Sequence, residues 1–123
     1  MKNNENEYLK TLVNQIVESI LSKKGKEIVS IDLRGIGSTV CDYFILCNGD
    51  SKTQVAAIAE GIDEQVKKNL HIDPHHREGM AYAHWVLLDY LDVVVHIFQK
   101  EYRDFYKLEN LWADGKIEYI EEE

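Results

Sequence analysis

A chain of 123 residues, with 45% apolar and 29% charged residues, has the size and balance of one globular domain with a modest core. Its formal net charge of −8, from 22 acidic and 14 basic residues, disfavours free nucleic acid as a partner and favours a basic protein. No apolar run approaches the roughly 20 residues that a membrane span needs, and the N-terminus lacks a signal peptide's apolar segment, so we expect a cytoplasmic protein without a membrane partner.

The N-terminal part of the chain predicts one helix and two strands. After a short flexible segment, apolar residues recur at helical spacing from Leu9 to Ile20 and end near Gly25. Strands are expected at 27–33 and 41–48, separated by the turn RGIGST. The second strand is nearly all apolar, which is typical of a central strand that is covered on both faces.

A second helix is expected to follow Gly49-Asp50-Ser51. Ser51 stands three residues before Gln54, which is the spacing of a capping box. The apolar stripe of this helix consists of Val55, Ile58, Ala59, Ile62 and Val66. The Gly-Asp-Ser motif could also hold a phosphate, as in a nucleotidyltransferase, but the acid-x-acid pair that would bind the metal is missing. A plain N-cap is therefore the favoured interpretation.

The C-terminal part predicts a hairpin, a third helix and an edge strand. A polar loop at 71–79 precedes strands at 81–89 and 92–99. An amphipathic helix is expected at 102–115, with Phe105, Leu108, Leu111 and Trp112 on one face, and a short edge strand at 116–120.

These elements predict one α/β (α+β) domain over residues 1–123, ending in an acidic tail. The connection from 41–48 through the helix to 81–89 implies a parallel, right-handed pair, and two hairpins add antiparallel pairs. The expected result is a mixed twisted sheet of about five strands with helices mainly on one face.

The hairpin has a predicted register, because a two-residue turn at Tyr90 and Leu91 determines which residues face each other. The expected pairs are Asp89 with Asp92, Leu88 with Val93, Leu87 with Val94, Val86 with Val95, and Trp85 with His96. One surface then carries only aliphatic residues and belongs under the helices: Val86, Leu88, Val93, Val95 and Ile97. The other carries Trp85, Leu87, Val94, His96 and Phe98, edged by the two aspartates.

The second surface has two interpretations that the pattern leaves open. A tryptophan and a histidine on an apolar surface next to acids are typical of a protein-binding patch. Alternatively, the third helix covers the surface and Trp85 belongs to the core. The two aspartates would repel each other as bare charges, so we expect them to face solvent or a basic partner.

Cysteines and histidines give no strong sign of chemistry. Cys41 and Cys47 would lie about 20 Å apart on one strand, beyond disulfide reach, so we expect two buried thiols. A histidine-containing loop matches no strong zinc pattern, and we predict neither a metal site nor a cofactor. Its residues are His71, His75, His76 and Glu78.

Three segments together resemble the ribosomal silencing factor family, also called the Iojap family. They are DYFILCNGDSKTQVAAIAEGI, EGMAYAHWVLLDYLDVVVHIF and YRDFYKLENLWAD, and the resemblance covers roughly residues 8–115. The ordered combination W-[VI]-[VL]-[LV]-D, V-V-H and Y-x-L-E-x-L-W is specific. The chain departs from the family at Leu91, where a glycine is usual. A non-glycine residue resists a positive φ there, and the turn could be wider than predicted.

The resemblance implies a non-enzymatic translation repressor. Such proteins bind the large ribosomal subunit through its fourteenth protein and block joining with the small subunit when nutrients are short. The family fold is similar to that of nucleotidyltransferases but lacks the catalytic carboxylates. A large-subunit assembly factor and a residual nucleotidyltransferase-like enzyme are the alternative functions.

The resemblance also assigns the partner contact to Trp85. Leu87, Asp89 and His96 should surround it on the same sheet face, and Tyr106 of the Y-x-L-E-x-L-W motif is the fifth candidate contact. An exposed apolar face in the free protein also predicts a possible homodimer, because a symmetric dimer is the commonest way to cover such a face.

Overall fold

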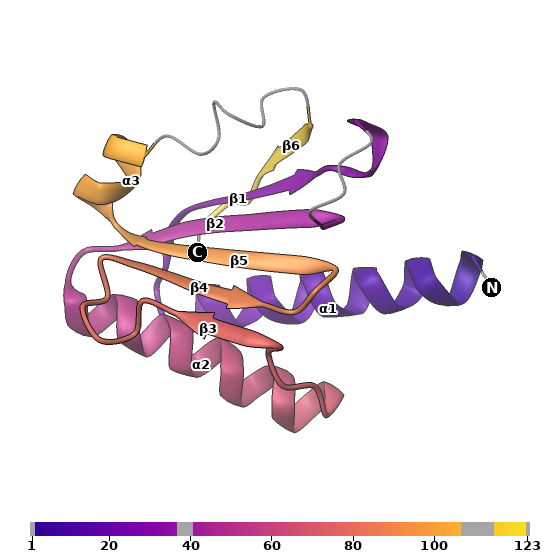
Figure 1. The fold of residues 1–123 in the computed structure, drawn as a ribbon, viewed down its shortest axis with the longest axis horizontal. Helices are drawn as coiled ribbons and strands as arrows, with labels where there is room; N and C mark the ends of the chain where they lie inside the picture. The colour runs from indigo at the N-terminus through magenta and orange to yellow at the C-terminus, as the bar shows by residue number, and fades with distance from the viewer. Residues whose placement is uncertain (1, 37–40, 107–114, 123) are drawn as a thin grey trace.

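The described residues, 2–36, 41–106 and 115–122 of a computed structural model, form a mixed six-stranded sheet with three α-helices (Figure 1). The helices are α1 (Lys2–Ser22), α2 (Lys52–Leu70) and α3 (Lys100–Tyr106), with a 3-10 turn at Arg34–Ile36. The strands are β1 (Lys26–Asp32), β2 (Tyr43–Gly49), β3 (His76–Glu78), β4 (Trp85–Asp89), β5 (Val93–Gln99) and β6 (Lys116–Tyr119). The predicted mixed sheet is confirmed.

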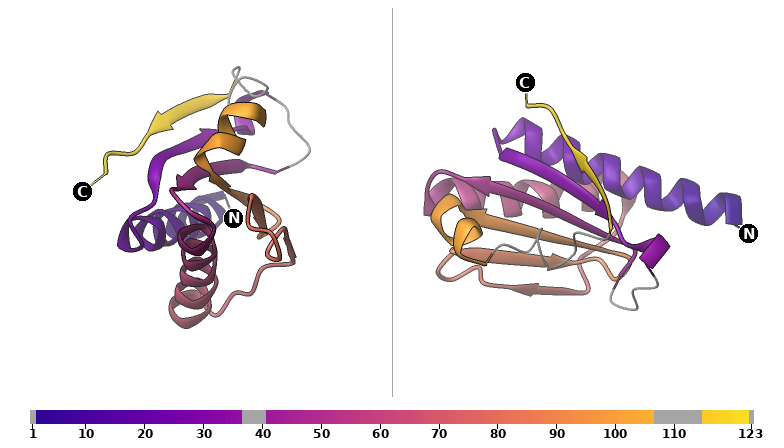
Figure 2. Two further views of the ribbon diagram at one scale, coloured as in Figure 1. Left: turned by 90° about the vertical axis from the view of Figure 1, so that its left-hand side faces the viewer. Right: turned by 90° about the horizontal axis from the view of Figure 1, so that it is seen from above.

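Two helices cover one face of the sheet. Helices α1 and α2 lie side by side on that face, and the short α3 lies on the other side (Figure 2). Their apolar stripes pack on the aliphatic side chains of β2, β4 and β5 to form the main core. The helices therefore lie mainly on one face, as expected. Among the described residues, no helix is long and apolar enough to cross a membrane.

The strand order corrects one predicted neighbour. The order is β3-β4-β5-β2-β1-β6, and the parallel partner of β2 is β5. The predicted parallel pairing of 41–48 with 81–89 is wrong, because β4 lies antiparallel on the far side of β5. Burial explains the choice, since β5 is buried at six consecutive positions whereas β4 alternates between buried and partly exposed positions. A strand that is apolar on both faces gains most from a central position.

The strands β4 and β5 pair in a register that is shifted by two residues from the predicted one. The Tyr90 N–H donates to the Val93 carbonyl at 2.8 Å and the Asp92 N–H donates to the Tyr90 carbonyl at 2.9 Å, so Leu91 is the centre of a tight γ-turn with φ of 72°. The observed pairs are Trp85 with Phe98, Val86 with Ile97, Leu87 with His96, Leu88 with Val95, and Asp89 with Val94. The predicted pairing of Trp85 with His96 and of Asp89 with Asp92 is therefore wrong.

Asp89 provides a physical reason for this register. Its Oδ1 accepts a hydrogen bond of 2.7 Å from the Leu91 N–H and closes the turn one step further along the chain. Because the shift is two residues, every side chain keeps its predicted face. Five aliphatic residues of the hairpin lie under the helices: Val86, Leu88, Val93, Val95 and Ile97. Trp85, Leu87, Val94, His96 and Phe98 lie on the other side.

Several helix and strand boundaries differ from those predicted from the sequence. Helix α1 is already helical at Lys2, in the segment that was expected to be flexible. Strand β3 forms in the predicted loop 71–79 by pairing with β4, and this sixth strand exceeds the expected five. Strand β4 begins at Trp85 rather than at residue 81. The expected helix 102–115 is described only up to Tyr106, and its remaining part, 107–114, lies outside the described residues. Strand β6 pairs with β1 at the sheet edge, as predicted.

Helix α3 is attached to the sheet by a buried arginine. The Arg103 guanidinium donates to Asn48 Oδ1 at 2.8 Å and to the Glu27 carbonyl. Only 4% of Arg103 is exposed, so these hydrogen bonds replace the water that the guanidinium loses on burial. The middle of α3 is thereby held beside the beginning of β1 and the end of β2.

Candidate functional site

The Gly-Asp-Ser motif is a helix cap. Ser51 Oγ accepts a hydrogen bond of 3.1 Å from the Gln54 N–H, and Gln54 Oε1 accepts one of 2.7 Å from the Asp50 N–H. The reciprocal pair is a variant of the capping box, displaced by one residue on the N-terminal side. The Ser51 hydroxyl therefore satisfies the first turn of α2, as the favoured interpretation predicted.

The cysteines and histidines do not assemble a reactive centre in the part of the chain that the structure describes. Burial raises the pKa of both Cys41 and Cys47 to about 12, so both remain neutral thiols at physiological pH, as expected of core residues. No group of three or more potential metal ligands occurs among the described residues. In the histidine-containing loop, His76 Nε2 lies 3.1 Å from Glu78 Oε2, and both side chains are exposed.

The sheet face opposite α1 and α2 carries three of the predicted contact residues, Trp85, Leu87 and His96. We call the side chains of Phe44, Trp85, Leu87, His96 and Phe98 on this face the aromatic face. Phe44 and Phe98 are buried, whereas Trp85 and Leu87 are partly exposed at the rim of this second core cluster. Tyr102 of α3 packs against the same cluster.

Ring contacts hold the indole of Trp85 in one orientation. Its ring stacks on Phe98 with centroids 5.2 Å apart, and its Nε1–H donates to His96 Nδ1 at 3.0 Å. The imidazole in turn meets the Phe44 ring edge-on, with centroids 4.9 Å apart. Aromatic contacts of this kind are favourable in both stacked and edge-on geometry.

His96 is a neutral, buried imidazole. Because Nδ1 accepts the hydrogen bond from Trp85, the ring proton resides on Nε2. Burial lowers the pKa of His96 to about 4, and only 4% of the residue is exposed. Within the described chain, Nε2 has no hydrogen-bond partner. A buried donor without a partner costs about 1–3 kcal/mol, so this histidine is not an optimal core residue.

The backbone that leads into Trp85 is also constrained. Gly79 has φ of 84°, and a Cβ added there would lie 2.1 Å from the Trp85 carbonyl oxygen. Ala83 is buried with φ of 55°, and its N–H donates to the Gly79 carbonyl at 2.9 Å. Gln99 donates from its side chain to the Ala83 carbonyl at 3.2 Å and from its backbone to the His84 carbonyl at 2.9 Å. Gly79, Ala83 and Gln99 were not identified from the sequence as residues that support Trp85. Of the three, only Gly79 could have been suspected, because a glycine is suited to a positive φ.

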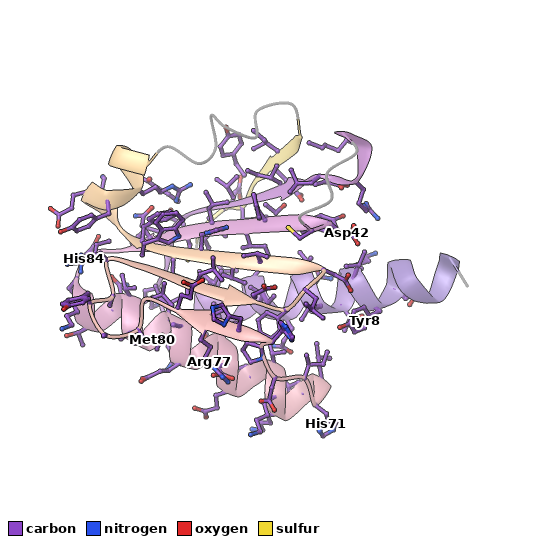
Figure 3. All side chains as sticks on the ribbon, viewed as in Figure 1. Tyr8, Asp42, His71, Arg77, Met80 and His84 are labelled. Carbon is purple, nitrogen blue, oxygen red and sulfur yellow. The ribbon has the colours of Figure 1, made fainter. Side chains whose placement is uncertain are left out.

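This loop brings His84 to the end of the sheet beside α3, whereas Asp42 marks the opposite end (Figure 3). The His84 imidazole stacks on the Tyr102 ring with centroids 4.2 Å apart. Tyr82, which is 73% exposed, lies next to this pair with its ring centroid 6.0 Å from that of His84. Polar aromatic side chains therefore continue the surface beyond Trp85.

The structure brings together three of the five predicted contact residues. Trp85 and Leu87 lie two residues apart on one face of β4, and His96 lies directly opposite Leu87 on β5. Asp89 lies at the other end of β4, where its carboxylate closes the hairpin turn. His96 is buried beneath the surface rather than exposed on it. Tyr106 is the last described residue of α3, and its side chain lies outside the described part of the structure.

Comparisons with known proteins give consistent results. The family described as "Ribosomal silencing factor during starvation" matches residues 6–123. The ribosomal silencing factor of Bacillus subtilis is 45% identical over 95 residues, which are 77% of this chain and 79% of the relative. The ribosomal silencing factor of Halalkalibacterium halodurans is 38% identical over 110 residues, which are 89% of this chain and 92% of the relative.

Solved structures show the same fold. A crystal structure of a Chromobacterium violaceum protein matches with a TM-score of 0.80 and 32% identity, covering 85% of each chain. A crystal structure from Bacillus halodurans matches with a TM-score of 0.75 and 37% identity, covering 91% of this chain and 98% of the other. The chain therefore belongs to the family of ribosomal silencing factors, which are regulators of translation and not enzymes.

Proposed function

We propose that this chain silences ribosomes by binding the large subunit on the face where the small subunit docks. Contact with the fourteenth protein of the large subunit then blocks the joining of the two subunits and reduces translation when nutrients are short. Membership of the silencing family supports this proposal, and so does the net charge of −8, which favours an encounter with a basic ribosomal protein.

The observation that carries the proposal is the partly exposed indole of Trp85 on the aromatic face. Trp85 stacks on Phe98 and its N–H is bonded to His96, so its position is preorganised on a rigid strand pair. Leu87 extends the apolar surface beside it. Tryptophan is among the residues that contribute most to protein interfaces, because one side chain buries a large rigid area. We assign the centre of the contact to Trp85 and Leu87, and Asp89 and Tyr106 stay predicted contacts.

Gradient sedimentation of mixed ribosomal subunits tests this function. Saturating protein should co-sediment with the large subunit and lower the yield of joined ribosomes. The matched control is Glu64→Gln, which changes an exposed acid on α2, on the other side of the sheet, and should act like the wild type. An unchanged yield of joined ribosomes at saturation would contradict the proposed block. A pull-down with the purified fourteenth protein tests the individual partner.

A second candidate function is assistance in large-subunit assembly. A mouse relative, 30% identical over 74 residues, carries the name "Mitochondrial assembly of ribosomal large subunit protein 1", and the match covers 58% of this chain and 32% of that protein. The two functions would use the same binding surface. Cells that lack the gene separate them: incomplete large subunits during growth indicate assembly, whereas normal subunits with unrestrained translation in starvation indicate silencing.

Self-association through the aromatic face stays a prediction. A dimer that covers Trp85 and Leu87 would compete with the ribosome for the same side chains. Light scattering at high concentration tests it, because a strict monomer would remove the idea. The expected location in the cytoplasm, and the lack of contact with membranes or free nucleic acid, also stay predictions.

A further inference from the structure

We infer that His96 is a positioning residue for docking: its Nδ1 holds the indole of Trp85 in the orientation that the ribosomal partner receives. This role rests on the proposed function, because it gives the Trp85 contact a supporting residue beneath the surface. His96 was predicted as a direct contact, but a side chain with 4% exposure presents almost no area to a partner. Its effect on docking therefore passes through Trp85.

The geometry defines what His96 does. The restraints on the Trp85 indole include the Phe98 ring against its face and the acceptor at its Nε1–H. Stacking alone allows an aromatic ring to slide and rotate in its plane, whereas a hydrogen bond of 3.0 Å at the ring edge fixes that rotation. The hydrogen bond and the stack together leave the indole one position before any partner arrives.

Stability by itself does not account for a histidine at this position. Its second nitrogen, Nε2, is buried and has no hydrogen-bond partner within the described chain. A phenylalanine would keep the edge-on contact with Phe44 and remove the unpartnered donor. The other ring nitrogen, Nδ1, accepts a hydrogen bond, and the donor is Trp85, the residue assigned to the ribosome contact.

The surrounding backbone supports the same purpose. Gly79 lets the loop pass against the Trp85 carbonyl, and Gln99 ties the residues just before Trp85 to β5. The backbone and the side chain of Trp85 are thus held by separate sets of contacts. Ordering a free side chain during association typically lowers affinity by about two- to tenfold, and a preordered indole avoids that loss.

The test compares His96→Phe with His96→Asn in the full-length protein. Phenylalanine keeps a ring but has no acceptor, whereas asparagine can place its amide oxygen close to the position of Nδ1. The affinity for purified large subunits should fall about five- to tenfold in His96→Phe and recover at least in part in His96→Asn. The melting temperature of His96→Phe should equal or exceed that of the wild type. If His96 were merely structural, His96→Phe would lower the melting temperature and the folded variant would keep its affinity for large subunits.

Two further measurements isolate the hydrogen bond. The chain has two tryptophans, so a Trp85→Phe variant assigns the Trp85 indole N–H in an NMR spectrum of the free protein. That resonance should move and exchange faster with water in His96→Phe. In the Trp85→Phe background, which lacks the indole N–H that His96 accepts, His96→Phe should cause no additional loss of affinity.

Different outcomes would contradict the proposed function and the role of His96. Wild-type protein that does not bind large subunits would overturn the proposed function, and with it this role of His96. Normal binding by His96→Phe, or an equal loss of affinity in the Trp85→Phe background, would overturn the role of His96 alone. An unchanged indole resonance in His96→Phe would show that the hydrogen bond does not hold Trp85.

Discussion

The two faces of the sheet differ in composition and in how much side-chain area they leave accessible to solvent. On the face under α1 and α2, the core side chains are mostly aliphatic and almost wholly buried, and Val86, Val95 and Ile97 have 0% exposure. Tyr90 in this core has a buried hydroxyl without a hydrogen-bond partner in the described chain. On the aromatic face, Trp85 is partly exposed and His96 keeps a buried nitrogen without a partner in the described chain. The first face buries almost all of its apolar area, whereas the second leaves part of Trp85 and Leu87 accessible, which stability does not require.

This difference teaches where to look for function in a small regulator without a catalytic centre. Trp85 and Val86 are neighbours in sequence, but the pleat of β4 directs them to opposite faces. A change at one position should affect mainly binding, and a change at the next should affect mainly folding. The following predictions test that contrast, from the largest expected effect to the smallest.

Val86→Asp should unfold the protein or destabilise it by about 4 kcal/mol or more, because it buries a carboxylate without a partner in the aliphatic core. Circular dichroism melting and urea unfolding measure the loss. Leu87→Asp is the matched control, because the same carboxylate then lies on the partly exposed aromatic face and should cost less than half as much. Equal losses at the two positions would contradict the division between the faces.

Trp85→Glu should leave the protein folded and lower its affinity for the large subunit by roughly 30- to 1000-fold, corresponding to about 2–4 kcal/mol. The variant removes the central aromatic contact and places a charge where the partner would exclude water. Co-sedimentation and a pull-down with the fourteenth ribosomal protein measure binding, and a melting curve on the same sample reports folding. A folded variant that binds normally would refute the site, and an unfolded one would assign Trp85 to the core.

Acid should destabilise the aromatic face through His96. Burial lowers the pKa of His96 from its ordinary value of 6.5 to about 4, so between these pH values the unfolded chain binds a proton that the folded chain does not. This contribution to stability is fully present above pH 6.5 and falls as the pH falls towards 4, by about 3 kcal/mol in total. Urea unfolding across this range should show the loss in wild type and a smaller loss in His96→Phe. An equal loss of stability with falling pH in the two proteins would contradict the assignment of this loss to His96.

Leu91→Gly should stabilise the protein by up to about 1 kcal/mol, because glycine adopts a positive φ without the strain of a Cβ. Leu91 has φ of 72° and is 58% exposed, so little packing is lost. Thermal melting measures the gain, and Leu91→Ala, which keeps a Cβ, should show none. The affinity for the large subunit should change little, since Leu91 is not among the assigned contacts and only Asp89 of those contacts adjoins the turn. A clearly weaker binding of Leu91→Gly would extend the contact surface to Leu91.

Much of the candidate site follows from the alternation of residues along the hairpin. Trp85, Leu87 and His96 were predicted on one face, and they lie there even though the turn is displaced. The supporting residues could not be predicted in the same way. Gly79 and Gln99 act on Trp85 and its neighbours through contacts between separate segments, and no local pattern reports such contacts.

The sequence by itself determined the family, the order of most elements and the face of each hairpin residue. A period of two survives any even change of register, and helical stripes such as that of α2 specify their buried side locally. Only the tertiary structure decided that β5 lies beside β2, that the turn is centred on Leu91 with a register shifted by two residues, and that His96 is covered. The reason is physical: neighbours in a sheet and burial of a side chain depend on the competition of distant segments for the same apolar surface, and that competition has no local signature in the chain.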